Sequence, residues 1–173
     1  TTCATPHPGI WAGGDATLQK EIALSGNRVG VGYRFAGAFE AAGISGFEST
    51  LDLAMPSCDG PGAHYLYRDV VAGGLGQPLE LDGMTELVLV DNFMGGSLTL
   101  RSNPPVALRA RPCYTVSQSE GGFEKIMQSV TLTLSWPLDA AHANMDLTLE
   151  IREVLFSSGQ HSVAMAVNHN RLA

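Results

Sequence analysis

Basic residues are scarce in this sequence. Its 173 residues include 10 Lys and Arg against 17 Asp and Glu, which gives a formal net charge of -7. Proteins that bind nucleic acids or anionic membranes need clustered Lys and Arg to neutralise phosphate groups. The charge balance therefore argues against both partners and favours a neutral polar ligand.

Long hydrophobic runs are also absent. No segment approaches the roughly 18 to 20 apolar residues of a membrane helix, so no membrane insertion is expected. The chain starts without Met and without a basic-then-apolar leader, which suggests a processed or excised segment. With 45% hydrophobic residues it can bury a sizeable core. No linker-like composition divides it, so residues 1–173 are predicted to form a single domain.

Cysteine is rare as well. Cys3, Cys58 and Cys113 are the three cysteines, and they form no CxxC pair. This excludes a four-cysteine zinc site and argues against a redox pair, so one disulfide and one free thiol is the simplest arrangement. A bridge at Cys3 would tie down the first strand, which favours an exported protein.

The familiar catalytic and metal-binding motifs are missing. The sequence has no GxSxG nucleophile turn, no HxH or HExxH pair and no DxDxDG calcium loop. No catalysis, metal or cofactor is therefore expected. A glycosidase carboxylate pair is neither supported nor excluded, because its spacing is set in space and not along the chain.

What the sequence does contain is period-two alternation of apolar and polar residues. Residues 28–35, 129–135 and 146–152 each alternate in this way. The positions expected to face the core are Val29, Val31, Tyr33, Phe35, Val130, Leu132, Leu134, Leu147, Leu149 and Ile151. Gly and Pro punctuate these segments at short intervals, which is typical of antiparallel all-β folds. The sequence predicts an antiparallel β-sandwich, with a small antiparallel β-barrel as the alternative.

Two stretches have the composition of a sugar-binding site. Residues 58–69 and 135–144 place aromatic rings beside carboxylates and amides, groups that stack on the apolar face of a sugar and bond its hydroxyls. The candidate ligand-binding residues there are Asp59, His64, Tyr65, Tyr67, Trp136, Asp139, His142 and Asn144. Ordinary polar turns explain both stretches equally well, and Trp136 could equally cap the core.

Several short motifs carry a family resemblance. Cys3 lies just inside the start, and Leu51, Asp52 and Leu53 lead to Cys58. An acid, a glycine and a proline follow, then residues 65–68 and a glycine pair, and a late strand covers residues 129–134. This order resembles the receptor-binding domain of chaperone-usher fimbrial tip adhesins.

The resemblance implies an elongated sandwich of immunoglobulin-like, jelly-roll character. It implies an exported adhesin that passes through the periplasm to the extracellular fimbrial tip, where it binds a host glycan or surface glycoprotein. A pilin-type domain and fimbrial subunits would be its other partners. The implied site consists of Thr1, Asp59 and the loop of residues 136–144, where Asp59 accepts ligand hydroxyls while Tyr65 or Trp136 stacks.

The resemblance also implies a disulfide between Cys3 and Cys58, with a Cys58 to Cys113 bridge as the alternative. Two other functions remain open. One is a small β-barrel that binds an apolar small molecule or acts as a cyclase. The other is a structural fibre or shell subunit, which would expose a strand edge for self-association.

Overall fold

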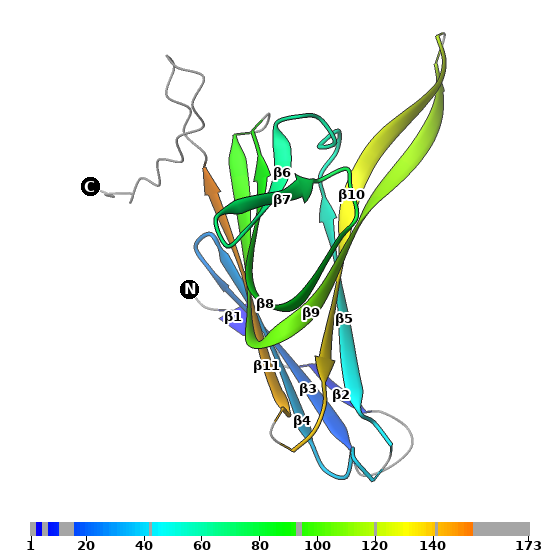
Figure 1. Ribbon diagram of the computed structural model, residues 1–173. Helices are drawn as coiled ribbons and strands as arrows, with labels where there is room; N and C mark the ends of the chain where they lie inside the picture. Colours follow the sequence, from blue (N-terminus) through cyan, green and yellow to red (C-terminus); the bar gives the residue numbers. More distant parts are fainter. Residues whose placement is uncertain are drawn as a thin grey trace, which may run out of the picture.

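The computed structural model describes residues 3–4, 7–10, 16–41, 43–92, 95–119, 121–140 and 142–153. Within these ranges the chain forms eleven strands that pair antiparallel throughout (Figure 1). They are β1 (Cys3–Ala4), β2 (His7–Ile10), β3 (Thr17–Ser25), β4 (Arg28–Ala36), β5 (Gly46–Ala54), β6 (Ala63–Tyr67), β7 (Val70–Gly74), β8 (Leu79–Asp91), β9 (Gly96–Ser119), β10 (Gly122–Pro137) and β11 (Asn144–Glu153). No helix in this part of the chain is long and apolar enough to cross a membrane.

The strands follow the order β1-β3-β4-β11-β9-β8-β6-β7, with β2 beside β3 and the β5–β10 pair beside β9. The long strand β9 changes neighbours along its length. Its residues 96–103 pair with β11, and its residues 107–119 pair with β10. Pro104 and Pro105 lie between the two pairings, where the missing N–H groups interrupt the ladder.

Strand β8 bends at the same level. Its register with β9 shifts between Leu81 and Glu86, and Gly83 there has a φ of 64°. Bulges of this kind sharpen the twist and bend the strand. Because β8 and β9 both bend, the sheet folds over into two layers, with β5 and β10 facing β4 and β11.

Aromatic side chains join the two layers. The ring of Tyr33 on β4 lies 4.8 Å from that of Phe47 on β5, measured between centroids, and Trp136 on β10 stacks on Phe47 at 5.8 Å. The Tyr33 hydroxyl also shares a 2.6 Å hydrogen bond with the Ser49 hydroxyl. The predicted antiparallel sandwich is thus confirmed. The barrel alternative is wrong, because β1 and β7 lie at the two open ends of the strand order.

The predicted alternation is confirmed on two strands and fails at one end of the third. Val31 and Tyr33 on β4 are buried, and Val130, Leu132 and Leu134 on β10 have no exposed surface. On β11 Leu147 is buried, but Ile151 is 61% exposed and Glu150 is buried. The burial of Glu150 has a clear cause. Its carboxylate lies on the outer face under three guanidinium groups, those of Arg28, Arg101 and Arg152.

Candidate functional site

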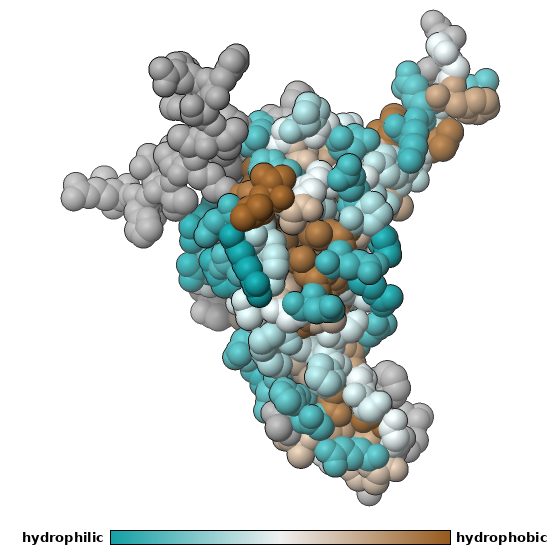
Figure 2. All heavy atoms as spheres, in the orientation of Figure 1, coloured by the Kyte–Doolittle hydropathy of each residue, from teal (hydrophilic) through white to brown (hydrophobic). Residues whose placement is uncertain are grey.

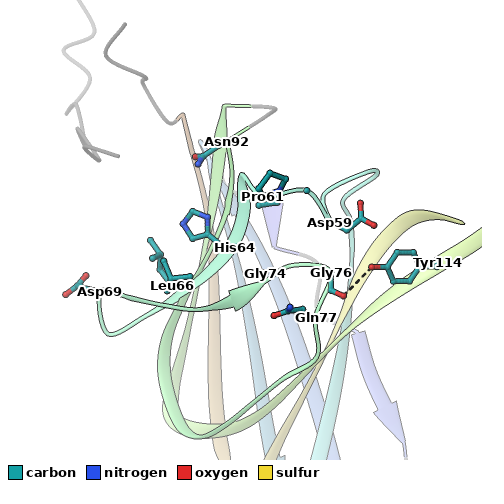
Figure 3. Close-up of a pocket in the computed structure, with 13 residues that line it drawn as sticks. Asp59, Pro61, His64, Leu66, Asp69, Gly74, Gly76, Gln77, Asn92 and Tyr114 are labelled. Carbon is teal, nitrogen blue, oxygen red and sulfur yellow. Dashed lines mark hydrogen bonds between the residues drawn. The ribbon is translucent and has the colours of Figure 1, made fainter. Parts of the chain in front are cut away.

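A hollow with a volume of about 1030 Å³ lies around β7 in the described part of the molecule (Figure 3). It brings together the turn before β6, the outer side of β6, the turn after β7, the end of β8 and one residue of β9. The lining residues are Asp59, Gly60, Pro61, Ala63, His64, Leu66, Asp69, Val71, Gly74, Gly76, Gln77, Asn92 and Tyr114. Carboxylate, amide, imidazole and phenol groups therefore share one hollow.

The turn that carries Asp59 is anchored by the residue before it. The buried thiol of Cys58 donates a hydrogen bond to the Asp91 carboxylate, with Sγ 3.0 Å from Oδ2. Burial, the hydrogen bond to Asp91 and the charges of Asp91 and Asp59 together raise the pKa of Cys58 to about 12. The Ser57 amide also donates to the Met127 carbonyl, at 3.0 Å. Asp59 thus extends from a turn that is fixed to two neighbouring strands.

Asp59, Tyr114 and Gly76 form one end of the hollow. The Tyr114 hydroxyl donates to the Gly76 carbonyl at 3.2 Å (Figure 3). The pKa of Tyr114 is raised by partial burial, by the Asp59 charge and by a hydrogen bond with Asp59. A Cβ at Gly76 would lie 2.6 Å from the Asp59 Cβ and 3.0 Å from the Tyr114 hydroxyl. Only glycine fits this position without movement of its neighbours.

His64, Leu66 and Asp69 form the other end of the hollow. Figure 3 shows them toward the opposite end of the hollow from Asp59 and Tyr114. His64 and Leu66 lie on β6, and Asp69 follows in a tight turn where its φ is 62°. The two acids that line the hollow, Asp59 and Asp69, are therefore at opposite ends and do not face one another.

Of the four candidate residues between positions 58 and 69, two line the hollow and two do not. Asp59 and His64 line the hollow, as a site there requires. Tyr65 points into the core with no exposed surface, and its hydroxyl has no hydrogen-bond partner among the described residues. Burial raises the pKa of Tyr65 to about 12. Tyr67 is half-buried, and the Arg68 guanidinium lies 4.9 Å from its ring centroid.

The second predicted stretch lies at the other end of the sandwich. The part of β10 that pairs with β5 runs from Ser129, paired with Ala54 near the hollow, to Pro137, paired with Gly46 at the far end. The loop after Pro137 is therefore remote from Asp59, and the structure does not bring Asp59 and this loop into one site, as the resemblance implied (Figure 1).

The four candidate residues of this second stretch each have a structural contact. Trp136 is buried, and its indole N–H lies 3.3 Å from the Ser102 hydroxyl. The His142 ring bonds the Asp139 carboxylate at 2.9 Å, and Asn144 pairs with a residue of β4. Thr1 lies outside the described residues.

The expected disulfides are not shown. Cys58 and Cys113 are both free thiols, one buried and one exposed. Strands β3, β4, β11, β9 and β8 separate β1, which carries Cys3, from β6, which follows Cys58.

Sequence reasoning missed Tyr114, Gln77 and Asn92. None of them belongs to a recognisable motif, and Tyr114 reaches the hollow only because β9 continues past the end of its pairing with β8 at Ala110. The glycine-rich stretch that includes Gly76 is a sequence signal of the close packing between Gly76 and Asp59. In the described residues, no group of three or more His, Cys, Asp or Glu side chains is placed to hold a metal ion.

Comparison with known families decides what kind of domain this is. Residues 6–151, most of the chain, match the family described as alpha-amylase/4-alpha-glucanotransferase, C-terminal. The chain belongs to this family. No curated protein matches it.

A 4-alpha-glucanotransferase from Thermococcus litoralis is one similar solved structure. The TM-score is 0.46 at 16% identity, over 86% of this chain and 22% of that chain. At this TM-score the likeness adds nothing to what the family match shows. This chain, a member of the amylase and glucanotransferase C-terminal family, spans about a fifth of that enzyme's length.

Family membership overturns the adhesin interpretation. The predicted adhesin function, the fimbrial-tip location outside the cell and the passage through the periplasm are all wrong, since they followed from the resemblance. The apolar-ligand or cyclase barrel and the fibre or shell subunit gain no support from the family either. The resemblance misled because glycine and proline turns between alternating strands recur in unrelated β-sandwiches.

Proposed function

We propose that this chain is the C-terminal β-domain of an enzyme that acts on α-1,4-linked glucans, and that it supports the catalytic part without supplying the catalytic residues. The family match over residues 6–151 is the observation that carries the proposal. The family's description names both a hydrolase and a transferase of such glucans.

The placement of carboxylates supports a non-catalytic role. Glycosidases need two carboxyl groups on either side of the scissile bond, about 5 to 10 Å apart. In the hollow, Asp59 and Asp69 lie at opposite ends (Figure 3). Other acids, such as Glu48, Glu80 and Glu86, pair with arginines across the outer faces of the sheet.

The test uses the natural full-length polypeptide that contains residues 1–173, compared with residues 1–173 alone. Each is incubated with maltoheptaose, and the products are separated by anion-exchange chromatography. We expect shorter maltooligosaccharides, and longer ones in the case of a transferase, from the full polypeptide only. If the full polypeptide left maltoheptaose unchanged, the substrate class would be wrong. Activity of residues 1–173 alone would disprove the non-catalytic role.

A further inference from the structure

The hollow continues onto a projecting hairpin, which we call the arm and define as residues 114–119 of β9 and 122–127 of β10. Figure 1 shows the arm leaving the body of the sandwich, and its two strands pair there only with each other. A two-stranded ribbon has little stability of its own in water.

One face of the arm begins at the hollow. Residues directly opposite in an antiparallel pair share a face, as do residues two apart on one strand. Tyr114 pairs with Met127, Val116 with Lys125, and Gln118 with Phe123. These six side chains thus lie on a single face of the arm, which starts at the hollow with Tyr114 and the buried Met127 and runs toward the tip. The Lys125 ammonium lies 3.9 Å from the Tyr114 ring centroid, which agrees with this arrangement.

The face combines exposed apolar groups with polar ones. Phe123 is 80% exposed and Val116 is 67% exposed. Hydrophobic side chains are visible on the arm in Figure 2. Exposed apolar side chains that lie together on one face mark a contact with a ligand or a partner more often than single scattered ones do. Phe123 lies four residues along β10 from Met127, the partner of Tyr114, so the two rings are about 13 Å apart along the arm.

The hollow supplies the polar half of a carbohydrate site. The Asp59 carboxylate and the Gln77 amide are at the same end as Tyr114, and His64 is at the other end. A sugar needs acceptors and donors for its hydroxyls and a flat apolar surface for its ring face. The hollow is larger than a single sugar ring requires, and its volume of about 1030 Å³ suits an oligosaccharide.

Resting on the proposed function, we infer that the hollow and this face of the arm bind a segment of a long α-1,4-glucan outside the catalytic centre. Asp59 and Gln77 bond glucose hydroxyls, and Phe123 packs on the apolar face of a sugar ring further along the chain. The site would hold a long glucan near the enzyme while leaving short substrates unaffected.

The experiment compares Asp59→Asn and Phe123→Ser in the full-length polypeptide. Asp82→Asn and Leu24→Ser are the matched controls, since Asp82 is an exposed acid at the bend of β8 and Leu24 is a 51% exposed apolar residue of β3. Binding of amylose is measured by affinity electrophoresis, and the KM for maltotriose is measured in parallel. Circular dichroism checks that each variant folds.

Asp59→Asn replaces hydrogen bonds to a charged group by weaker bonds to a neutral amide, which should weaken amylose binding about tenfold. Loss of the ring contact should weaken it about fivefold in Phe123→Ser. The KM for maltotriose and both control variants should stay unchanged. Unchanged amylose binding in the two test variants would overturn the inference. An equal rise in the KM for maltotriose in Phe123→Ser would show that the arm contacts the rest of the enzyme, and would overturn the role of the arm. A wild-type enzyme inactive on both glucans would instead refute the proposed function.

Discussion

The thiol of Cys58 and the carboxylate of Asp91 form a buried hydrogen bond, with Sγ 3.0 Å from Oδ2. Asp91 is the last residue of β8, and Cys58 lies in the turn that leads to Asp59. The pair therefore links the end of a core strand to the edge of the hollow. A thiol held in this way is protonated at neutral pH, since its pKa is raised to about 12.

The first prediction concerns the reactivity of the cysteines, because only the thiolate is nucleophilic. Cys58 should resist iodoacetamide at pH 8 in the native protein, whereas the exposed Cys113 should react. Both should react after denaturation in guanidinium chloride. Peptide mass spectrometry under non-reducing conditions identifies the labelled sites, with Cys113→Ser as the control. A peptide in which Cys3 is disulfide-bonded to Cys58 would contradict the free thiol.

The second prediction concerns the buried hydroxyl of Tyr65. It has no partner among the described residues, and a buried polar group without one is unfavourable. Tyr65→Phe should therefore raise the free energy of unfolding by about 1 kcal/mol at pH 7. Urea denaturation measures this value. A lower stability of the variant would show that the hydroxyl does have a partner.

Tyr65 should also make the protein sensitive to alkali. Its pKa is raised from 10.0 to about 12 in the folded state, so the unfolded chain loses this proton first. The contribution to stability is complete below pH 10 and is lost as the pH rises toward 12. Tyr65→Phe should lose less stability than the wild type over this interval. Identical pH profiles would mean that the phenol ionises equally easily in both states.

The third prediction uses two glycines of the hollow. A Cβ at Gly76 would lie 2.6 Å from the Asp59 Cβ, whereas a Cβ at Gly60 would meet nothing within 4 Å. Gly76→Ala should lower the free energy of unfolding by about 1 to 3 kcal/mol, the usual cost of overpacking. Gly60→Ala should change it little. Thermal unfolding compares the two, and equal midpoints would show that the Asp59 turn moves aside without cost.

The fourth prediction concerns the arginines around Glu150. Arg101 bonds both Glu86 and the buried Glu150, at 2.7 and 3.1 Å. Arg109 pairs only at the exposed surface, with Glu48, at 3.0 Å. Arg101→Gln should lower the free energy of unfolding by about 1 to 3 kcal/mol, because it removes a charge partner from a buried carboxylate. Arg109→Gln should cost at most about 1 kcal/mol. If urea denaturation gave the same loss in the free energy of unfolding for both variants, the buried Glu150 would have no special role.

The same cluster predicts a response to acid. Burial by itself would raise the pKa of Glu150, but the hydrogen bonds from Arg152, Arg28 and Arg101 outweigh it and lower the pKa. The contribution to stability is therefore present above the pKa of the unfolded chain and is lost as the pH falls through the folded value. As the pH falls below 5, the free energy of unfolding should decrease less in Glu150→Gln than in the wild type. An unchanged acid profile would contradict the shift.

Much of the strand pattern could be predicted because it is local. Side chains alternate along any strand, so Val130, Leu132 and Leu134 were assigned to the core from their spacing alone, and all three are buried. The same reasoning failed at Ile151. The exposure of Ile151 depends on which part of the chain packs over that end of β11. The neighbouring residues in the sequence give no information about this.

The candidate site could be predicted only in part for the same reason. Asp59 and His64 are near each other in the sequence, and both line the hollow. Trp136 was grouped with them by composition, yet it packs on Phe47 in the core. A residue type shows which contacts a side chain can make, and the fold determines which it does make.

The sequence by itself determined that the chain would form antiparallel β-layers, because alternation with a period of two buries one face of each strand and leaves the other to solvent. Only the tertiary structure decided which turns share a rim. The bends of β8 and β9 and the direction of β10 place the turn of Asp59 beside Tyr114 and put the loop after Pro137 at the other end. Those placements depend on pairings between residues far apart in the chain, and local periodicity carries no information about them.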